Sequence, residues 1–193
     1  MLPDDNDSVR SLDMPRPWYP SPMWSPLQLM ETYRHMEWAD ATVWDATPLT
    51  GPPDPRLREL LVHIHVVQRA FFSAWTNRPV MEAFRRAEDF ETLGAVRLWA
   101  QPLYREMAAF IQGLTVESLA KPMNLPWAQM IAERLGRTPH VTTLADTCFQ
   151  VTSHSTYHRG QVNTRLREIG AEPPLVDYIA WAWFGKPDAE WKM

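Results

Sequence analysis

The chain has 193 residues, 45% of them hydrophobic and 22% charged, a composition that fits one globular domain with a single core. Its net charge of -4 argues against broad electrostatic binding of nucleic acid, and no run of about 18 apolar residues predicts a membrane span. The single cysteine, Cys148, excludes an internal disulfide, and the chain does not start with a secretory pattern, so we expect a cytoplasmic protein.

Residues 1–24 differ from the rest of the chain in their proline content. Prolines occur there at Pro3, Pro15, Pro17, Pro20 and Pro22. Proline has no backbone N–H and disrupts both helices and strand ladders. We therefore expect a Pro-rich N-terminal arm over residues 1–24 and one folded domain over residues 25–193.

Four long segments carry the pattern of amphipathic helices. They cover residues 25–46, 55–77, 89–112 and 142–169. Ser25 followed by Pro26 is typical of a helix start, Pro102 predicts a kink or a break in the third segment, and Gly170 is a natural end for the fourth. Four long helices with few strand signals predict an all-α helical bundle.

The segment between the third and fourth helices is rich in glycine and proline. Over residues 113–140, a short hairpin and a short helix around the sequence WAQMIAERL are both compatible with the pattern.

Two histidines, His154 and His158, lie four residues apart on the last predicted helix, so both rings project from one face. On a helical wheel they lie on the shoulder of an apolar stripe, where the helix meets a neighbour. The stripe comprises Leu144, Cys148, Val151, Ser155, Val162, Leu166 and Ile169. Two hypotheses fit this position: a pair of packed histidines, or two ligands of a metal site in the groove between helices.

The second helix offers two candidates for a third ligand, His63 and His65, in the sequence HIH. They point in nearly opposite directions on a helix, so at most one can join the same site. The wheel favours His63, beside the apolar stripe. It places His65 toward Arg58 and Arg69, and this predicts a surface or crevice histidine.

These motifs resemble the DinB/YfiT-like superfamily of metal-binding proteins, over roughly residues 27–182. The first helix carries a Trp-Ala-Asp motif at Trp38, Ala39 and Asp40. In the second helix His63 follows two leucines, and Arg69 comes six residues later. The most specific part is the last motif, with His154, His158, Arg159, Gly160, Gln161, Leu166, Arg167, Gly170, Pro173, Pro174 and Asp177.

The resemblance implies an up-down-down-up four-helix bundle, commonly a homodimer, with a divalent metal held by three histidines. Carried over by position, the ligands are His63, His154 and His158. Zinc, nickel and iron all accept imidazole, and we expect zinc or nickel. The chain departs from the family at His65, an extra histidine, and at Gln68, where the family often has an acidic residue.

Residues near the three histidines invite further roles. Asp40, Thr147 and Gln150 are candidate outer partners that fix the rings of the ligands. Arg159 and Arg165 could hold a substrate carboxylate, although for Arg159 we favour a salt bridge between helices or across a dimer.

Three other residues call for separate expectations. Cys148 lies on the core stripe, which predicts a buried small hydrophobe. Gly160 is expected to serve close helix packing, and His140 is a candidate general base or fourth ligand before the last helix.

Two function hypotheses follow from the resemblance. The first is a divalent-metal-dependent enzyme acting on a small molecule, as a transferase that uses a low-molecular-weight thiol or as a hydrolase. The alternative is a non-catalytic stress-response or binding module with a structural or regulatory metal. Three neutral histidine ligands leave a coordination position open, which is typical of catalytic sites and favours the enzyme.

Overall fold

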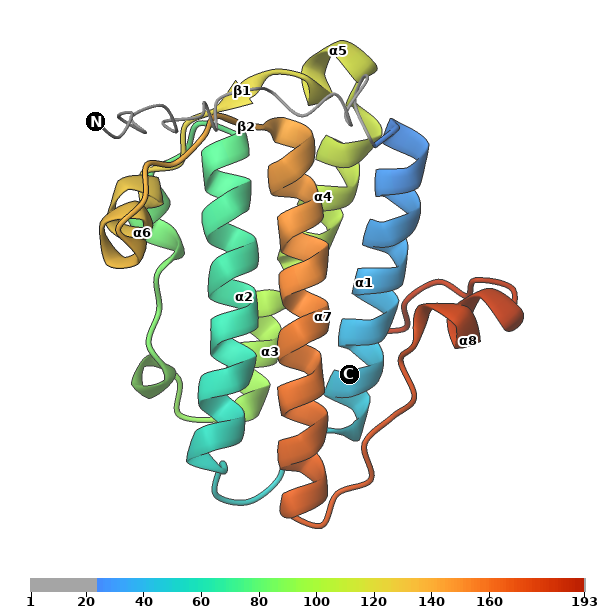
Figure 1. Ribbon diagram of the computed structural model, residues 1–193. Coiled ribbons are helices and arrows are strands. Elements are labelled where there is room, and N and C mark those ends of the chain that lie inside the picture. The colour runs from blue at the N-terminus through green and yellow to red at the C-terminus, as the bar shows by residue number, and fades with distance from the viewer. Residues whose placement is uncertain (1–23, 193) are drawn as a thin grey trace, which may run out of the picture.

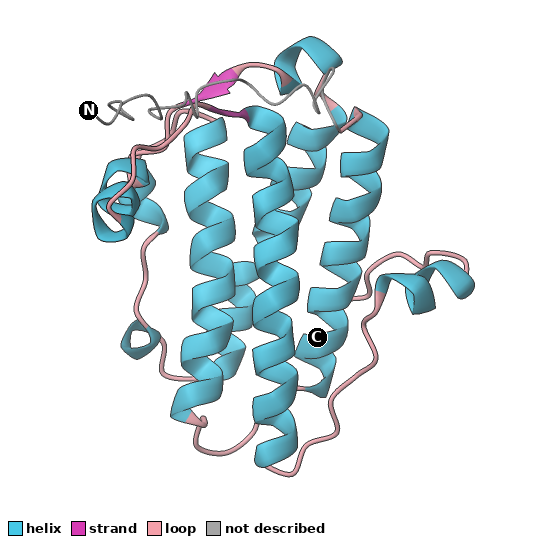
Figure 2. Cartoon of the chain, viewed as in Figure 1, coloured by secondary structure: helices cyan, strands magenta, loops and turns pink. Residues whose placement is uncertain are grey.

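Helices dominate the structure, a computed structural model that describes residues 24–192 (Figures 1 and 2). The long helices are α1 (Pro26–Ala46), α2 (Pro55–Trp75), α3 (Leu93–Ala100), α4 (Pro102–Gln112) and α7 (Leu144–Glu168). Shorter helices are α5 (Val116–Leu119), α6 (Ala128–Leu135) and α8 (Tyr178–Trp183), with single 3₁₀ turns at Val80–Ala83 and Ala87–Asp89. The predicted all-α class is confirmed.

Helices α1, α2 and α7 begin within two residues of the predicted positions, at residues whose side chains satisfy free backbone N–H groups, whereas α3 begins at Leu93 and not at residue 89 as predicted. The hydroxyl of Ser25 accepts from the N–H of Gln28 at 3.2 Å, and the Gln28 side chain accepts from the N–H of Ser25 at 2.9 Å. Asp54 caps α2, and Thr143 forms a capping box with Asp146 at the start of α7. These caps fix where α1, α2 and α7 begin.

Four helical units lie side by side: α1, α2, α7 and the pair α3–α4 (Figure 1). Figure 1 shows α1 and α7 running in one direction and α2 and α3–α4 in the other. The break between α3 and α4 falls at Pro102, as predicted. Helix α7 packs against both α2 and α1, so residues on its two sides face different neighbours.

Buried apolar side chains from all four units fill the space between them. One cluster includes Leu29, Phe71, Leu103 and Val151, and a second includes Trp44, Leu61, Val96 and Val162. The predicted apolar stripe of α7 is buried from Leu144 to Leu166, and this confirms the inward face of that helix. The histidine pair of α7 therefore lies beside the core and not within it.

The segment between α4 and α7 contains both alternatives that the sequence left open. Strands β1 (Pro122–Met123) and β2 (Thr142–Thr143) form a short antiparallel pair, and the sequence WAQMIAERL forms α6. Helix α6 ends at Gly136, whose φ of 63° lies in the left-handed region that glycine adopts without strain.

Both ends of the described chain pack against the helical bundle. The predicted N-terminal arm lies outside the described residues except for Trp24, whose ring stacks on Phe149 at 4.6 Å. Helix α8 was not predicted; it lies beside α1, where its Trp181 is fully buried. Within residues 24–192, no helix combines the length and the apolar character needed to cross a bilayer.

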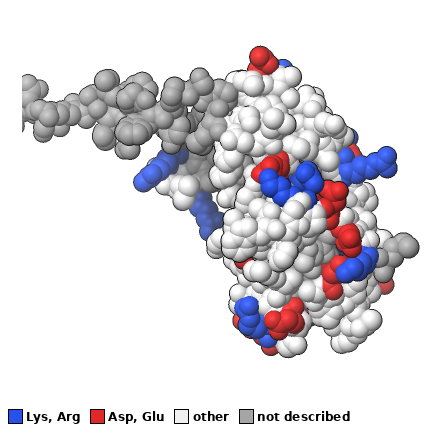
Figure 3. Space-filling model, turned by 90° about the vertical axis from the view of Figure 1, so that its right-hand side faces the viewer, with Lys and Arg blue, Asp and Glu red and all other residues white. Residues whose placement is uncertain are grey.

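Acidic and basic side chains are interspersed on the face that carries α8 (Figure 3). Two ion pairs join the C-terminal segment to α1 there: Arg34 with Asp188 at 2.8 Å and Lys186 with Glu31 at 2.7 Å. The face shown has no concentrated basic patch of the kind that binds nucleic acid.

Candidate metal centre

Three histidines from two helices meet on one side of the bundle. His63 comes from α2, and His154 and His158 come from successive turns of α7. One potential ligand atom from each ring lies within 4.8 Å of the other two. The Nε2 atoms of His63 and His154 are only 3.3 Å apart, so the predicted trio comes together in space.

The ring of His158 is held by a neighbour on its own helix. Its Nδ1 lies 2.8 Å from Oε1 of Gln161, one turn further along α7. An amide oxygen only accepts, so this bond places the proton on Nδ1 and leaves the lone pair on Nε2. A histidine prepared in this way can bind a metal through Nε2.

Desolvation and mutual repulsion lower the pKa of two of the three histidines. The pKa of His154 is lowered to about 4, first by burial and then by the proximity of His158 and His63. The pKa of His63 is lowered too, first by the partial desolvation of its ring and then by His158 and Arg56. A metal ligand must present a neutral imidazole, so both shifts favour metal binding at neutral pH.

The cluster has one open side and one polar atom without a partner. The side chain of His63 is exposed, and the ring of Tyr157, also exposed, lies edge-on to His158 with centroids 4.9 Å apart. Nδ1 of His154 is buried and has no hydrogen-bond partner among the described residues. Among the described residues, the only hydrogen-bond partner of the His154 ring is thus Nε2 of His63.

The expectation that His65 is a surface or crevice histidine was wrong, because this side chain is only 1% exposed. The helical wheel placed it toward Arg58 and Arg69 and treated that side of α2 as solvent-facing. Both arginines instead bond to backbone carbonyls, Arg58 to Phe90 and Arg69 to Trp99, while Trp44 of α1 and Tyr104 of α4 pack against the ring of His65.

Neither nitrogen of His65 is free to bind a metal. Nε1 of Trp44 can only donate, and it lies 3.0 Å from Nε2 of His65. Nδ1 of His65 therefore carries the proton and donates to Oε1 of Gln68 at 2.8 Å. The extra histidine of the sequence is a member of the core.

The expectation that Asp40, Thr147 and Gln150 fix the rings of the ligands was also wrong. Among the described residues, none of these side chains forms a hydrogen bond to the three histidines. Asp40 pairs with Arg159 at 2.8 Å, and Thr147 accepts from Trp75 at 2.9 Å. Gln150 is exposed. The partner that the sequence argument missed is Gln161. Its position three residues after His158 on the same shoulder of the helix was the available signal.

The two arginines considered for substrate binding are engaged by carboxylates of the chain itself. Arg159 forms the predicted interhelical salt bridge with Asp40, and each of the two side chains is 3% exposed. Arg165 holds both oxygens of Asp54 at 2.9 and 2.6 Å, and this pairing lowers the pKa of Asp54 to about 2. Arg165 thus joins the end of α7 to the N-cap of α2.

Two further expectations have clear outcomes. Cys148 is fully buried, and burial raises the pKa of its thiol to about 12, which confirms a small core residue. His140 is exposed and does not belong to the group of three histidines. Neither residue is placed to take part in chemistry at the cluster.

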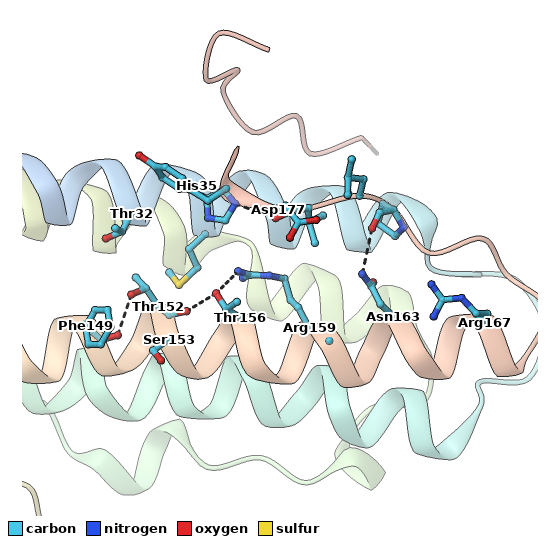
Figure 4. A pocket seen from close by; sticks show the side chains of 16 residues that line it. Thr32, His35, Phe149, Thr152, Ser153, Thr156, Arg159, Asn163, Arg167 and Asp177 are labelled. Carbon is cyan, nitrogen blue, oxygen red and sulfur yellow. Dashed lines mark hydrogen bonds between the residues drawn. The ribbon is translucent and has the colours of Figure 1, made fainter. Parts of the chain in front are cut away.

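A groove of about 700 Å³ lies on the other side of α7, between that helix, α1 and residues 174–178 (Figure 4). None of the three histidines lines it. Arg159 does, and Figure 4 shows its bond to Thr156, 2.8 Å long. Gly160 also lines the groove, and a Cβ there would meet no atom within 4 Å, so its expected role in close helix packing was wrong.

The structure is an all-α bundle in which two helices bring three imidazoles together, an arrangement that resembles the metal sites built between the helices of other bundles. Comparison with known families gives the particular family. The sequence model of the DinB family matches residues 51–193, well over half of the chain, and the protein belongs to this family. The match includes all three histidines but begins after α1, so it does not cover the Trp-Ala-Asp motif. A comparison with curated proteins finds no match.

Proposed function

We propose that His63, His154 and His158 hold one divalent metal ion and that the protein is a metal-dependent enzyme acting on a small molecule. The convergence of three imidazoles from α2 and α7 carries this proposal. Membership in the DinB family supports it independently of the geometry.

The spacing of the rings fits such an ion. Two nitrogens bound to one tetrahedral zinc, each about 2.0–2.1 Å from it, are separated by about 3.3–3.4 Å. The Nε2 atoms of His63 and His154 are 3.3 Å apart. In the absence of metal the same distance suits an N–H···N bond between two neutral rings, so the two helices can hold this separation in both states.

Zinc and nickel are the ions we favour, with iron as a third, because each accepts imidazole. A bound divalent ion supplies Lewis acidity, which lowers the pKa of a water or a thiol that occupies its open position. The three ligands are neutral and would leave the positive charge of the ion uncompensated, so an anionic or thiol-bearing substrate suits the site. The exposed side of His63 gives such a molecule a path to it.

Two reaction classes suit a three-histidine site of this kind: transfer that uses a low-molecular-weight thiol, and hydrolysis of an amide or ester. Within the site, the residues of this chain have separate roles. The imidazoles of His63 and His154 stay neutral because their pKa values are lowered, and Gln161 orients His158. Thiol transfer requires no base from the protein once the thiol is deprotonated, and we therefore rank it first.

One observation favours the non-catalytic alternative, a binding or stress-response module with a structural or regulatory metal. Among the residues that the structure describes, no carboxylate or thiol joins the group of three histidines. A hydrolase of this kind would need a general base nearby to direct a water molecule.

The two functions are separated by one experiment on the metal-loaded protein. Turnover is measured with a panel of low-molecular-weight thiols and electrophilic acceptors and with activated esters. The enzyme proposal predicts thiol-dependent turnover that is lost in His63→Ala and retained in His140→Ala. One metal ion per chain without turnover of any substrate class would favour the module.

A further inference from the structure

A buried polar cluster contains one side chain from each of the four helical units. Asp40 comes from α1, Gln68 from α2, Tyr104 from α4 and Arg159 from α7. Each of the four residues is at most 3% exposed. We call this group the Asp40 cluster. It lies at the level of the bundle where the three histidines meet, since Gln68 is five residues from His63 and Arg159 directly follows His158.

Both oxygens of the Asp40 carboxylate are engaged. Arg159 Nη1 donates to Oδ1 at 2.8 Å, and Gln68 Nε2 donates to Oδ2 at 2.9 Å. The hydroxyl of Tyr104 also donates to Oδ2. Gln68 Nε2 makes a second bond, 3.1 Å long, to Oγ of Ser155. The cluster is thus hydrogen-bonded to α7 at two residues one turn apart, Ser155 and Arg159.

These two residues directly follow the two histidines of α7. One residue along a helix corresponds to a rotation of about 100°. When Ser155 and Arg159 point to the Asp40 cluster, His154 and His158 are turned toward α2 and His63. The rotation of α7 that satisfies the buried bonds is therefore the rotation that brings the three rings together.

Hydrogen bonds fix this rotation more tightly than apolar packing does. An N–H···O bond loses much of its energy outside about 2.7–3.2 Å, whereas apolar side chains can slide and repack. A buried charge without its partner is strongly unfavourable, so Arg159 and Asp40 allow few alternative arrangements. A fully bonded buried network specifies one arrangement of the helices around it.

We propose that the Asp40 cluster positions His154 and His158 against His63, and that Asp40, Gln68 and Arg159 are positioning residues of the metal site. This inference rests on the proposed metal site. It assigns a shared role to the Trp-Ala-Asp motif of α1 and to the arginine after the second histidine of α7, neither of which contacts the three rings.

The experiment is a Co²⁺ titration of full-length protein followed by the visible absorption of the bound ion, which reports coordination geometry. Arg159→Gln is expected to bind Co²⁺ about 10- to 100-fold more weakly, as when an outer partner of a ligand is lost. Its spectrum at saturation is expected to differ from that of the wild type, because the ligands no longer share one arrangement.

Thr147→Val is the matched control. Thr147 also accepts a bond from α2, from Trp75 Nε1 at 2.9 Å, but it lies seven residues before His154 and outside the cluster. This variant is expected to keep the affinity within about twofold and to keep the spectrum, because its bond to Trp75 lies about two helical turns before His154 and outside the buried network that sets the rotation of α7 at the histidines. Val96→Ala, a core truncation on α3, controls for a general loss of stability and is expected to leave the spectrum unchanged.

Wild-type affinity and spectrum in Arg159→Gln would overturn the proposal, as would an equal change in Thr147→Val. If Arg159→Gln does not fold, Ser155→Ala carries the test, because it removes one acceptor and leaves no charge unpaired. A smaller loss of affinity in the same direction is expected for it, and no loss would overturn the proposal.

A wild type that binds no metal would contradict the proposed function but not the role of the cluster. The cluster is then tested in the metal-free protein by nuclear Overhauser contacts between the ring protons of His63 and His154. The contacts are expected in the wild type and in Thr147→Val, and they are expected to disappear in Arg159→Gln. Their persistence in Arg159→Gln would overturn the inference.

Discussion

His63 and His65 lie two residues apart on α2 and have opposite environments. His63 is exposed, and its Nε2 faces a second imidazole at 3.3 Å. His65 is buried, and its two nitrogens are held by Trp44 and Gln68. The comparison shows that burial alone does not identify a metal ligand. The free nitrogens identify it, and only the exposed histidine turns one toward other potential ligands.

The same division appears on α7. His154 and His158 face α2 with lone pairs available, while Ser155 and Arg159, one step further along, are bonded into the Asp40 cluster. Each helix thus presents a site residue and a core residue within one or two positions. Substitutions of His63 and His65 on α2 should therefore separate metal binding from stability, whereas on α7 the two are coupled through the proposed positioning role of Arg159.

The largest expected effect is on metal affinity, from loss of a ligand. In His154→Ala we expect affinity for Zn²⁺ or Co²⁺ to fall by more than about 100-fold, since even loss of an outer partner costs about 10- to 100-fold. The far-ultraviolet circular dichroism of the metal-free variant should match the wild type. Isothermal titration calorimetry measures the affinity, and near-normal binding would remove His154 from the site.

The converse effect is expected from His65→Ala. This variant leaves a cavity and removes the acceptor of the buried Nε1 of Trp44 and one donor to Oε1 of Gln68. We expect it to lower the free energy of unfolding by about 2–5 kcal/mol, the range for truncating a large buried side chain. Urea unfolding of the metal-free protein measures this. The folded variant should still bind one metal ion per chain, and loss of stoichiometric binding would mean that His65 is a ligand.

A smaller effect is expected from Gln161→Leu, which removes the acceptor that fixes the ring of His158. Metal affinity should fall by about tenfold, at the low end for outer partners, because two of the three ligands are untouched. Stability of the metal-free protein should change little, since the bond is partly exposed. Gln150→Leu, on an exposed position of the same helix, is the matched control. Equal affinity in both variants would contradict the assigned role.

A further expected effect is the pH dependence of stability without metal. The pKa of His154 is about 4 in the folded state and near 6.5 in the unfolded chain, so the unfolded chain binds more protons between these values. Stability should rise from about pH 4 to about pH 6.5 and then level off. The lowered pKa values of His63 and His65 act in the same direction.

Urea unfolding across this range measures the effect, with His154→Gln expected to show a shallower slope. A wild-type profile that is flat below pH 6.5 would show that the cluster is not desolvated as described.

Much of the fold could be predicted because it depends on local patterns. The cap at Ser25 and the break at Pro102 are set by residues a few positions apart, and the structure has them where the sequence placed them. The apolar stripe of α7 was readable for the same reason, since a period of 3.6 residues decides which face is buried. Helix α8 was missed because six residues carry too little periodicity.

The three histidines could be predicted together, but their surroundings could not. The wheel gives the direction of a side chain from its own helix and says nothing about what lies opposite. The side of α2 with His65 looked polar because of Arg58 and Arg69, and it is covered because Trp44 of α1 and Tyr104 of α4 pack against His65. Asp40 was expected beside the ligands for the same reason, since only the packed bundle shows that Arg159 claims it.

The homodimer implied by the family resemblance stays a prediction, which light scattering at micromolar concentration would check.

The most direct test of the account is the metal content per chain of freshly purified wild type, His63→Ala and His65→Ala, measured by elemental analysis after reconstitution with Zn²⁺. The account predicts about one ion per chain in the wild type and in His65→Ala, and none in His63→Ala. A metal-free wild type, or one in which His65→Ala and not His63→Ala loses the ion, would contradict it.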